Sequence, residues 1–477
     1  MLVRRLYHPR LAQASYLIAC NKCREAVVID PLRDAELYLA AAAADNVRIT
    51  AVTETHVHAD FISGSRELAA RTGARLYLSG EGRGPWSYTD AYIADTGATL
   101  LHAGDVIHIG EIEITVLHTP GHTPEHLSFL VTDTAVAAEP MAAVTGDFVF
   151  VGDVGRPDLL ERAVLIAGSA DTAARQLYTS VRRFAGFADH LQIWPGHGAG
   201  SACGKDLSGV PQSTLGYERR YNWAFRIDDE AGFVKSALHG LAEPPAYFAE
   251  MKRVNARGPG RWSDVKRPAL VTPADIVEAV EAGAMVIDIR TAADFGAGHI
   301  PGTINIPLNR SFLLWAGSLI PLGGAVTLIG DEAQLADAVR DLALIGIDHV
   351  VGYAGPEVVD AWQRSGRPLE QVAHTTTDAV AAGVGNGGVS VVDVRYSAEW
   401  DAGHVPGAMH IPLSTLRDRL AELPRDRPLV VHCQTGGRAA IATSVLQAAG
   451  FGNVVEMHGG MTAWRRAGHD VATGQDG

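Results

Sequence analysis

The chain has 477 residues, 47% of them hydrophobic, which is enough for roughly three domains of about 150 residues that each bury a core. Its 40 Lys and Arg against 54 Asp and Glu give a net charge of −14, which disfavours nucleic acid or an anionic membrane surface as a partner. No apolar run reaches the roughly 18 residues of a membrane-spanning helix, and the basic N-terminus lacks the apolar core and cleavage site of a signal peptide. Four cysteines are too few for a disulfide framework. We therefore expect a cytoplasmic protein.

Predicted strands and helices alternate along the N-terminal half, which indicates an α/β fold. In chain order they are strands at 15–19 and 26–29, a helix at 35–44, a strand at 49–52, a helix at 63–72, and strands at 112–117 and 127–131. Cys20 and Cys23 have a spacing found in metal and redox sites. No second pair completes a four-cysteine site, so we interpret them as part of a turn between the first two strands.

Four polar motifs each follow the end of a predicted strand, where α/β sites usually form. They are Thr55-His56-Val57-His58-Ala59-Asp60-Phe61, Thr119-Pro120-Gly121-His122-Thr123, Thr145-Gly146-Asp147 and Pro195-Gly196-His197-Gly198. A single histidine is more often structural than a metal ligand, and we interpret His118 and His126 as structural. Four motifs at four strand ends instead predict a metal site.

These motifs, in this order, resemble the metallo-β-lactamase superfamily over residues 1 to about 245, and the resemblance implies an αββα sandwich. For the two-metal hydrolases of the superfamily it implies a first site of His56, His58 and His122, a second site of Asp60, residue 61 and His197, and a bridging Asp147. Phe61 has no atom that binds a metal, so the second site lacks a ligand. A one-metal site is therefore favoured over a two-metal site.

The remaining ligand set is His56, His122 and Asp147. Two imidazoles and one carboxylate suit iron(II) and leave positions open for oxygen and a substrate. This arrangement resembles the persulfide dioxygenases. The resemblance implies one Fe(II) per chain and the oxidation of a low-molecular-weight thiol persulfide by O2 to sulfite and the thiol.

The same resemblance implies roles for five neighbours of the metal. His58, Asp60 and His197 would orient the ligands and bound water. Arg156, in the loop after the metal-binding aspartate, would face the thiol substrate. Cys203 follows His197 by six residues in a glycine-rich loop, and it would accept or present sulfur at the mouth of the iron site.

The C-terminal half contains a repeat with a constant offset of 105 residues, in which Asp288, His299 and Pro307 return as Asp393, His404 and Pro412. The offset indicates a first domain at 1–245, a linker at 246–267, and two tandem domains at 268–370 and 371–477. In the second copy, a strand at 390–394, a strand at 428–432 and a helix at 438–449 are predicted. Each copy should form a mostly parallel sheet with helices on both faces.

The strand at 428–432 ends at Cys433-Gln434-Thr435-Gly436-Gly437-Arg438, and a helix follows. A cysteine at this junction faces backbone N–H groups and the positive end of the helix, which favours the nucleophilic thiolate. With the motifs before it, this loop resembles the rhodanese family over 370–477. The resemblance implies that Cys433 carries the transferred sulfur, that Gln434 to Gly437 form the substrate cradle, and that Arg438 provides positive charge for thiosulfate or sulfite.

The middle copy lacks these chemical groups. Ile329 and Gln334 align with the cysteine and the arginine of the active loop, and Asp331 and Glu332 would repel an anionic donor. We interpret 268–370 as an inactive rhodanese-like domain that serves as a scaffold or interface. The whole chain resembles fusions of a persulfide dioxygenase with a sulfurtransferase, which detoxify persulfides derived from sulfide.

The implied partners are a small thiol persulfide, O2, and sulfite or thiosulfate, while a homo-oligomer stays open. Two other functions stay open as well: a dinuclear zinc thioesterase of the glyoxalase II type with sulfurtransferase domains, and a sulfur-relay protein without catalysis. Phe61 argues against the thioesterase. A relay protein would hold a stable persulfide without turnover.

Overall fold

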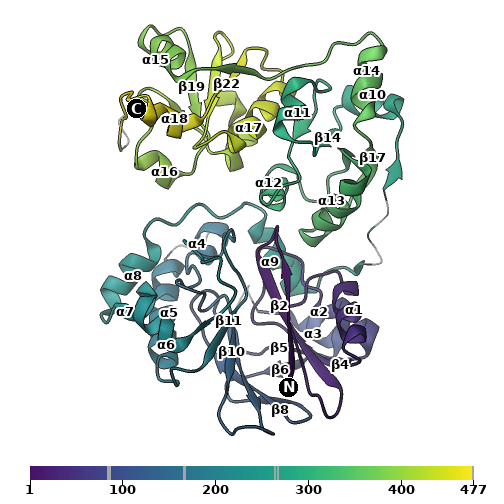
Figure 1. Cartoon of the computed structure of the whole chain (residues 1–477), viewed down its shortest axis with the longest axis vertical. Coiled ribbons are helices and arrows are strands. Elements are labelled where there is room, and N and C mark those ends of the chain that lie inside the picture. The colour runs from purple at the N-terminus through teal and green to yellow at the C-terminus, as the bar shows by residue number, and fades with distance from the viewer. Residues whose placement is uncertain (83–86, 165–167, 263–264, 266–267, 475–477) are drawn as a thin grey trace. The chain divides into compact units, whose positions relative to one another are not determined.

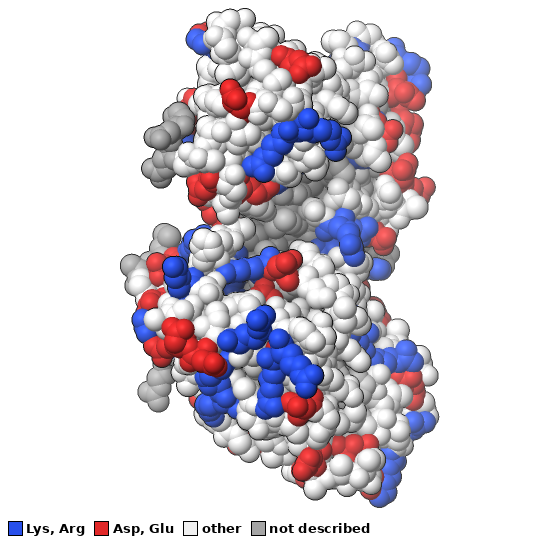
Figure 2. Space-filling view, turned by 60° about the vertical axis from the view of Figure 1, so that its left-hand side comes forward, with Lys and Arg blue, Asp and Glu red and all other residues white. Residues whose placement is uncertain are grey.

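A computed structural model describes residues 1–474 apart from 83–86, 165–167, 263–264 and 266–267. The chain forms two compact units, residues 1–264 with 343–346 and residues 265–342 with 347–477. Within the described ranges no helix is long and apolar enough to cross a lipid bilayer. On the face drawn in Figure 2, basic and acidic side chains lie among uncharged ones.

The first unit contains two six-stranded sheets. The first sheet follows chain order: β1 (Leu2–His8), β2 (Gln13–Ala19), β3 (Glu25–Ile29), β4 (Arg48–Thr53), β5 (Arg75–Ser79) and β6 (Thr99–Leu101). The second has the order β12 (Ser213–Thr214), β11 (Gln192–Pro195), β10 (Ala142–Gly146), β9 (Leu127–Asp133), β8 (Ile112–His118) and β7 (Val106–Ile109). Strands β3 to β6 are parallel, and so are β10 and β11, whereas the other neighbours are antiparallel.

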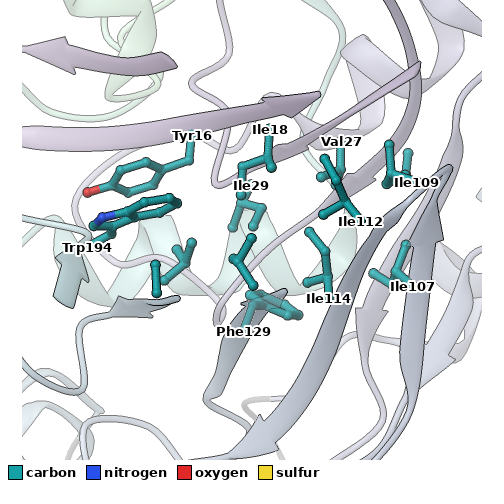
Figure 3. Packing of buried hydrophobic residues seen from close by; sticks show 14 of the residues in the cluster. Tyr16, Ile18, Val27, Ile29, Ile107, Ile109, Ile112, Ile114, Phe129 and Trp194 are labelled. Atoms are coloured by element: carbon teal, nitrogen blue, oxygen red, sulfur yellow. The ribbon is translucent and has the colours of Figure 1, made fainter. Parts of the chain in front are cut away.

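The main core lies between these two sheets, because alternate side chains of each strand face the opposite sheet (Figure 3). Tyr16 and Ile18 of β2 face inward, as do Ile112 and Ile114 of β8, and all four are buried. Tyr16 stacks on Trp194 of β11 with ring centroids 5.8 Å apart. Each such side chain contributes about 1.5–3 kcal/mol when fully buried, so this layer holds the two sheets together.

Helices cover the outer face of each sheet (Figure 1). The first sheet is covered by α1 (Glu36–Ala44), α2 (Ser65–Thr72) and α3 (Asp90–Thr96). The second is covered by α4 (Leu159–Val164), α5 (Ser169–Phe184), α6 (Leu215–Tyr221), α7 (Trp223–Arg226) and α8 (Glu230–Leu238). Leu177 and Val181 of α5 pack with Ile193 of β11 in a second core. The predicted αββα sandwich is confirmed.

Helix α9 (Phe248–Arg257) lies in the range that the sequence predicted as a linker, 246–267. Phe248, Met251 and Asn255 recur at helical spacing and are buried, so this segment packs on the first unit, which extends to residue 264. The prediction gave too much weight to Gly258-Pro259-Gly260, which ends the helix rather than the domain.

The second unit contains two five-stranded sheets in which every pair of neighbours is parallel. The middle copy is built from β13 (Ala269–Leu270), α10 (Pro273–Glu281), β14 (Met285–Asp288), α11 (Ala292–Ala297), β15 (Ile304–Asn305), α12 (Phe312–Leu319), β16 (Val326–Ile329), α13 (Glu332–Leu344), β17 (Val350–Ala354) and α14 (Glu357–Arg364). The last copy is built from β18 (Ala373–Thr375), α15 (Thr377–Gly385), β19 (Ser390–Asp393), α16 (Ser397–Asp401), β20 (Met409–His410), the 3-10 helix η2 (Leu413–Glu422), β21 (Leu429–His432), α17 (Gly437–Ala448), β22 (Val454–Met457) and α18 (Gly460–Arg466).

The repeated motifs adopt the same local structure in both copies. His299 stacks on Phe295, with ring centroids 3.7 Å apart, and its Nδ1 donates to the Phe295 carbonyl at 3.0 Å. His404 stacks on Trp400 at 3.5 Å and donates to the Trp400 carbonyl at 3.1 Å. Both sheets also have the same strand order when each is numbered from its own first strand. The predicted tandem repeat is therefore confirmed as two copies of one α/β fold.

Candidate metal centre and cysteine loop

Three of the four strand-end motifs bring metal-binding atoms together. Potential ligand atoms of His56, His122 and Asp147 all lie within 4.8 Å of one another. The Nε2 atoms of His122 and His56 lie 3.5 Å and 3.9 Å from Asp147 Oδ2. These three atoms are buried and have no hydrogen-bond partner among the residues that the structure describes. Buried polar atoms are rarely left unpaired, so their convergence fits a bound cation.

The protonation states of this trio also fit a metal. Burial, with the nearby His58 and His122, lowers the pKa of His56 well below its usual value, and burial lowers the pKa of His122 to about 4. Burial would raise the pKa of Asp147, but His197 and His122 lower it below its usual value. Two neutral imidazoles and a carboxylate are the forms that bind a divalent metal.

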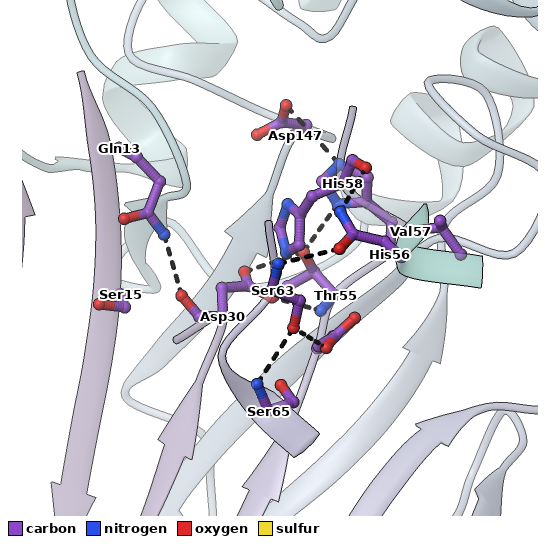
Figure 4. A network of polar contacts seen from close by, with 12 residues as sticks. Gln13, Ser15, Asp30, Thr55, His56, Val57, His58, Ser63, Ser65 and Asp147 are labelled. Carbon is purple, nitrogen blue, oxygen red and sulfur yellow. Dashed lines mark hydrogen bonds and ion pairs between the residues drawn. The ribbon is translucent and has the colours of Figure 1, made fainter. Parts of the chain in front are cut away.

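Hydrogen bonds fix the orientation of both imidazoles, and Figure 4 shows Asp30, Thr55 and His56 of this network. Asp30 accepts the Thr55 backbone N–H at 2.6 Å and the Thr55 hydroxyl at 2.9 Å. The Thr55 oxygen is then free to accept Nδ1–H of His56 at 2.9 Å, and the Arg156 carbonyl accepts Nδ1–H of His122 at 3.0 Å. Both Nε2 lone pairs are thereby turned toward Asp147.

Asp30 was not identified as part of the site from the sequence. It directly follows β3 and has a φ of +54°, in the left-handed region that Asp tolerates better than most residues. His58 turns away from the trio and places Nε2 3.1 Å from Asp30 Oδ1. Burial would lower the pKa of His58, but Asp30 raises it. The only sequence signal was the pair Asp30-Pro31 at a strand end.

His197 links two carboxylates beside the trio. Its Nδ1 lies 2.6 Å from Asp147 Oδ1, and its Nε2 lies 2.8 Å from Asp60 Oδ2. Burial would lower the pKa of His197, but Asp147 and Asp60 raise it well above its usual value. Phe61 is fully buried against the His58 ring, with centroids 4.4 Å apart, and offers no ligand atom here. This geometry fits the predicted role of His197 and Asp60 in orienting the metal ligands.

His126 and His118 are not part of the ligand trio, but their environments differ. His126 Nε2 accepts the backbone N–H of Asp147 at 3.1 Å, and its ring stacks on His56 with centroids 5.1 Å apart. His118 instead donates to the Pro124 carbonyl at 2.8 Å. His126 therefore positions Asp147, whereas His118 contacts its own loop and lies 3.9 Å from Glu81.

Cys203 reaches the site, whereas the guanidinium of Arg156 is held in an internal pair. Cys203 is 1% exposed and groups with Asp60 and His197 within 4.8 Å. Burial, with Asp147 and Asp60, raises the pKa of its thiol well above the usual value. Arg156 pairs with Asp158 at 2.7 and 2.8 Å and is 3% exposed. The structure thus places Arg156 in a supporting role, through its carbonyl contact with His122, instead of facing a substrate.

Helix α9 adds a residue that no sequence motif indicated. Asn255 accepts the backbone N–H of Ser63 at 2.9 Å, and its amide donates to the carbonyls of His58 at 2.9 Å and Phe61 at 2.7 Å. One side chain therefore satisfies three backbone groups of the loop that carries the metal ligands. Its place in the presumed linker gave no reason to select it.

The second site lies at the end of β21. Cys433 is 2% exposed, and its Sγ accepts the backbone N–H of Gly436 at 3.1 Å. Gly436 has a φ of +129°, a conformation that favours glycine, and Gly437 begins α17. Gln434 is held by Thr462 at 3.1 Å. The structure thus places the thiol against the first turn of the helix, as predicted for residues 433–438.

Arg438 is not left as a free positive charge. It forms two hydrogen bonds with Glu399, at 2.6 and 2.7 Å, and its guanidinium lies over the Tyr396 ring at 5.2 Å. The sequence predicted that the Arg438 charge serves an anionic sulfur donor, whereas in the structure this charge is paired with Glu399. In the middle copy, Ile329 is buried in β16, and α13 begins at Glu332 without a cysteine in the loop.

Comparisons with known proteins agree with this architecture. A model of the metallo-beta-lactamase superfamily matches residues 8–197, and a model of the rhodanese-like domain matches residues 272–355 and 376–467. The crystal structure of a metallo-beta-lactamase from Staphylococcus aureus subsp. aureus COL is 38% identical, covers 75% of this chain, and is itself covered to 99%, with a TM-score of 0.67. The chain therefore belongs to the metallo-beta-lactamase superfamily, and two tandem rhodanese-like domains follow its superfamily domain.

Three relatives indicate the range of activities nearby. The mitochondrial persulfide dioxygenase ETHE1 of Bos taurus is 28% identical over 241 residues, which are 49% of this chain and 80% of that protein. A hydroxyacylglutathione hydrolase of Polaromonas sp. is 34% identical over 185 residues, 38% of this chain and 61% of that protein. A sulfurtransferase of Allochromatium vinosum is 38% identical over 80 residues, 17% of this chain and 75% of that protein.

Proposed function

We propose that the N-terminal domain is a one-iron persulfide dioxygenase and that the last rhodanese domain transfers sulfur through Cys433. The observation that carries the first part is the convergence of the unpaired atoms of His56, His122 and Asp147 beside a position 61 that holds phenylalanine. Bound there, iron(II) would supply oxygen activation next to the persulfide sulfur. The relative named as a persulfide dioxygenase supports this choice.

The residues around the trio have defined roles in this proposal. Thr55 and the Arg156 carbonyl keep each Nε2 free of a proton, and His197 bonds to Oδ1 of Asp147, which leaves Oδ2 facing both imidazoles. Burial of the whole cluster excludes bulk water, which strengthens the electrostatic interactions within it. The substrate is a small thiol persulfide, and the products are sulfite and the free thiol.

The test is oxygen consumption with glutathione persulfide, on full-length protein loaded anaerobically with iron(II). We expect uptake that disappears in His122→Ala, because one of three ligands is lost. His118→Ala is the matched control, since its ring donates to the Pro124 carbonyl and lies outside the ligand trio. Equal loss in both variants, or no uptake by protein shown to hold iron, would reject the dioxygenase.

At the second site, the Cys433 thiolate would attack the outer sulfur of a persulfide. The S–S bond breaks, the thiol leaves with a proton, and sulfite then takes the sulfur from the Cys433 persulfide to give thiosulfate and the thiolate. Cys433→Ser should abolish thiosulfate formation and leave oxygen uptake intact. Loss of both activities in this variant would contradict two separable sites.

A hydrolase is the second candidate, because the hydroxyacylglutathione hydrolase has the higher identity to this chain of the two N-terminal relatives. Phe61 argues against it, since a shared hydroxide between two metals needs a full second ligand set. Hydrolysis of a glutathione thioester without oxygen, by protein that contains two metal ions per chain, would favour this candidate.

A further inference from the structure

Two cysteines outside both proposed sites share one tight turn. Cys20 and Cys23 lie between β2 and β3, and two backbone hydrogen bonds close the turn: Cys20 N–H to Glu25 O at 2.9 Å and Arg24 N–H to Cys20 O at 3.0 Å. Arg24 has a φ of +59°, so the chain reverses sharply. Cys20 is 3% exposed, whereas Cys23 is exposed to solvent. The turn predicted from sequence is present, and it pairs an inner thiol with an outer one.

The β7–β8 turn of the opposite sheet packs directly on both sulfurs. A β-carbon at Gly110 would lie 2.5 Å from Cys23 Sγ and 2.7 Å from Cys20 Sγ. The two sulfurs are therefore within 5.2 Å of each other, the sum of these distances. Figure 3 shows Ile109 and Ile112, on either side of this turn, beside Val27 of β3. Only glycine allows so close an approach.

Backbone donors distinguish the two thiols chemically. Burial would raise the pKa of Cys20, but hydrogen bonds from the backbone N–H groups of Cys23, Glu111 and Lys22 lower it below its ordinary value. Burial raises the pKa of Cys23, and the neighbouring Cys20 sulfur raises it further. Lys22 and Glu111 form an ion pair across the two turns, so the Lys22 charge nearby is balanced by a carboxylate. Negative charge is thus favoured on the inner sulfur.

We propose that Cys20 and Cys23 form a thiol–disulfide exchange site, which low-molecular-weight disulfides or persulfides oxidise reversibly to an intramolecular disulfide. In the first step, the exposed Cys23 gives its proton to the nearby Cys20 sulfur and attacks one sulfur of a small disulfide, whose S–S bond breaks. One small thiol leaves with the Cys23 proton, and Cys23 holds a mixed disulfide. In the second step, the Cys20 thiolate attacks Cys23 Sγ and expels the second thiol.

The balance of this reaction needs no other reactant. Two cysteine thiols are oxidised to one disulfide, and one small disulfide is reduced to two thiols. A persulfide would give one thiol and hydrogen sulfide instead. Hydrogen bonds that stabilise the reduced Cys20 sulfur make a disulfide easier to reduce, so we expect a reversible pair and not a structural crosslink.

The exchange site is distinct from the metal centre. Gln13, at the other end of β2, bridges to His197 beside the metal trio. Cys20 follows Gln13 by seven residues, and a strand rises about 3.3 Å per residue, so Cys20 lies roughly 23 Å along the chain from Gln13. A small oxidant can therefore reach Cys23 without entering the site proposed for iron.

The test uses full-length protein and mixtures of reduced and oxidised glutathione, with mass spectrometry of a peptic peptide that contains both cysteines. We expect the wild-type peptide to lose two hydrogen masses as the mixture becomes oxidising, to keep no glutathione, and to return to the dithiol with dithiothreitol. Cys20→Ala and Cys20→Ser should instead retain glutathione on Cys23, because the resolving sulfur is gone.

Two results would overturn the proposal. One is a wild-type pair that stays reduced in every mixture that oxidises a free dithiol peptide. The other is retention of glutathione on Cys23 in the wild type as in the Cys20 variants, which would show that Cys20 does not resolve the adduct. If the Ala and Ser variants behave alike, the retained glutathione reflects the missing Cys20 sulfur and not misfolding, because Ala keeps the buried position apolar.

Discussion

Removal of the Asn255 side chain should loosen the loop that carries the metal ligands. Asn255→Ala leaves the Ser63 N–H and the carbonyls of His58 and Phe61 without their partner. A buried hydrogen bond contributes about 1 kcal/mol net, and a buried group left unpaired costs about 1–3 kcal/mol. With water partly replacing the amide, we expect local opening of the loop to become easier by about 3 kcal/mol.

The assay is hydrogen exchange of peptides that span residues 56–63 in the full chain. A change of about 3 kcal/mol corresponds to roughly a hundredfold faster exchange where local opening limits the rate. Metal affinity, from competition with a chelator, should fall by about 10–100-fold, the usual effect of losing a residue that orients ligands. Both readouts report the same loss of loop order.

Two further variants serve as controls: one changes another residue of α9, and the other makes a different substitution at Asn255. Arg253→Ala changes an exposed residue of α9 and should alter stability by less than about 0.5 kcal/mol. Asn255→Asp keeps the acceptor for the Ser63 N–H but loses both donors, so we expect most of the effect of the alanine variant. Unchanged exchange and metal affinity in Asn255→Ala would refute the reasoning, and equal changes in Arg253→Ala would assign the effect to the helix as a whole.

Three further predictions follow from the same structure. Asp30→Asn keeps a side chain that tolerates the left-handed backbone but replaces the carboxylate that binds Thr55 and His58 with an amide. Metal affinity, measured by titration with a chelator, should fall by about 10–100-fold, and an unchanged affinity would contradict the role given to Asp30. Ile329→Cys, made with Cys433→Ser, should give no sulfur transfer from thiosulfate, because Glu332 and Ala333 stand where the active loop has Gly436 and Gly437. Measurable transfer would show that the loop still functions. Removal of the metal with a chelator should lower the melting temperature of the first unit in calorimetry and leave that of the second unit unchanged, because a ligand stabilises only the unit that binds it. A shift in both melting temperatures would contradict a metal site confined to the first unit.

The sequence by itself determined which positions of this protein are candidates for its chemistry. The histidine motifs, Asp147 and Cys433 could be found because each follows a strand end, and strand ends are visible in local alternation and in Gly and Pro residues. The tandem repeat was visible because a constant offset needs no knowledge of contacts. These signals lie in the sequence itself, so they can be found without knowledge of the tertiary contacts.

Only the tertiary structure decided which side chains support these positions. Asn255 is 192 residues from Ser63, and Asp30 is 25 residues from Thr55, so neither contact leaves a periodic trace in the sequence. The pairing of Arg438 with Glu399 likewise depends on how α16 and α17 pack. Gly110 meets the two cysteines only because the two sheets close on each other. Contacts between distant segments form when layers pack, and that packing is not encoded in any single motif.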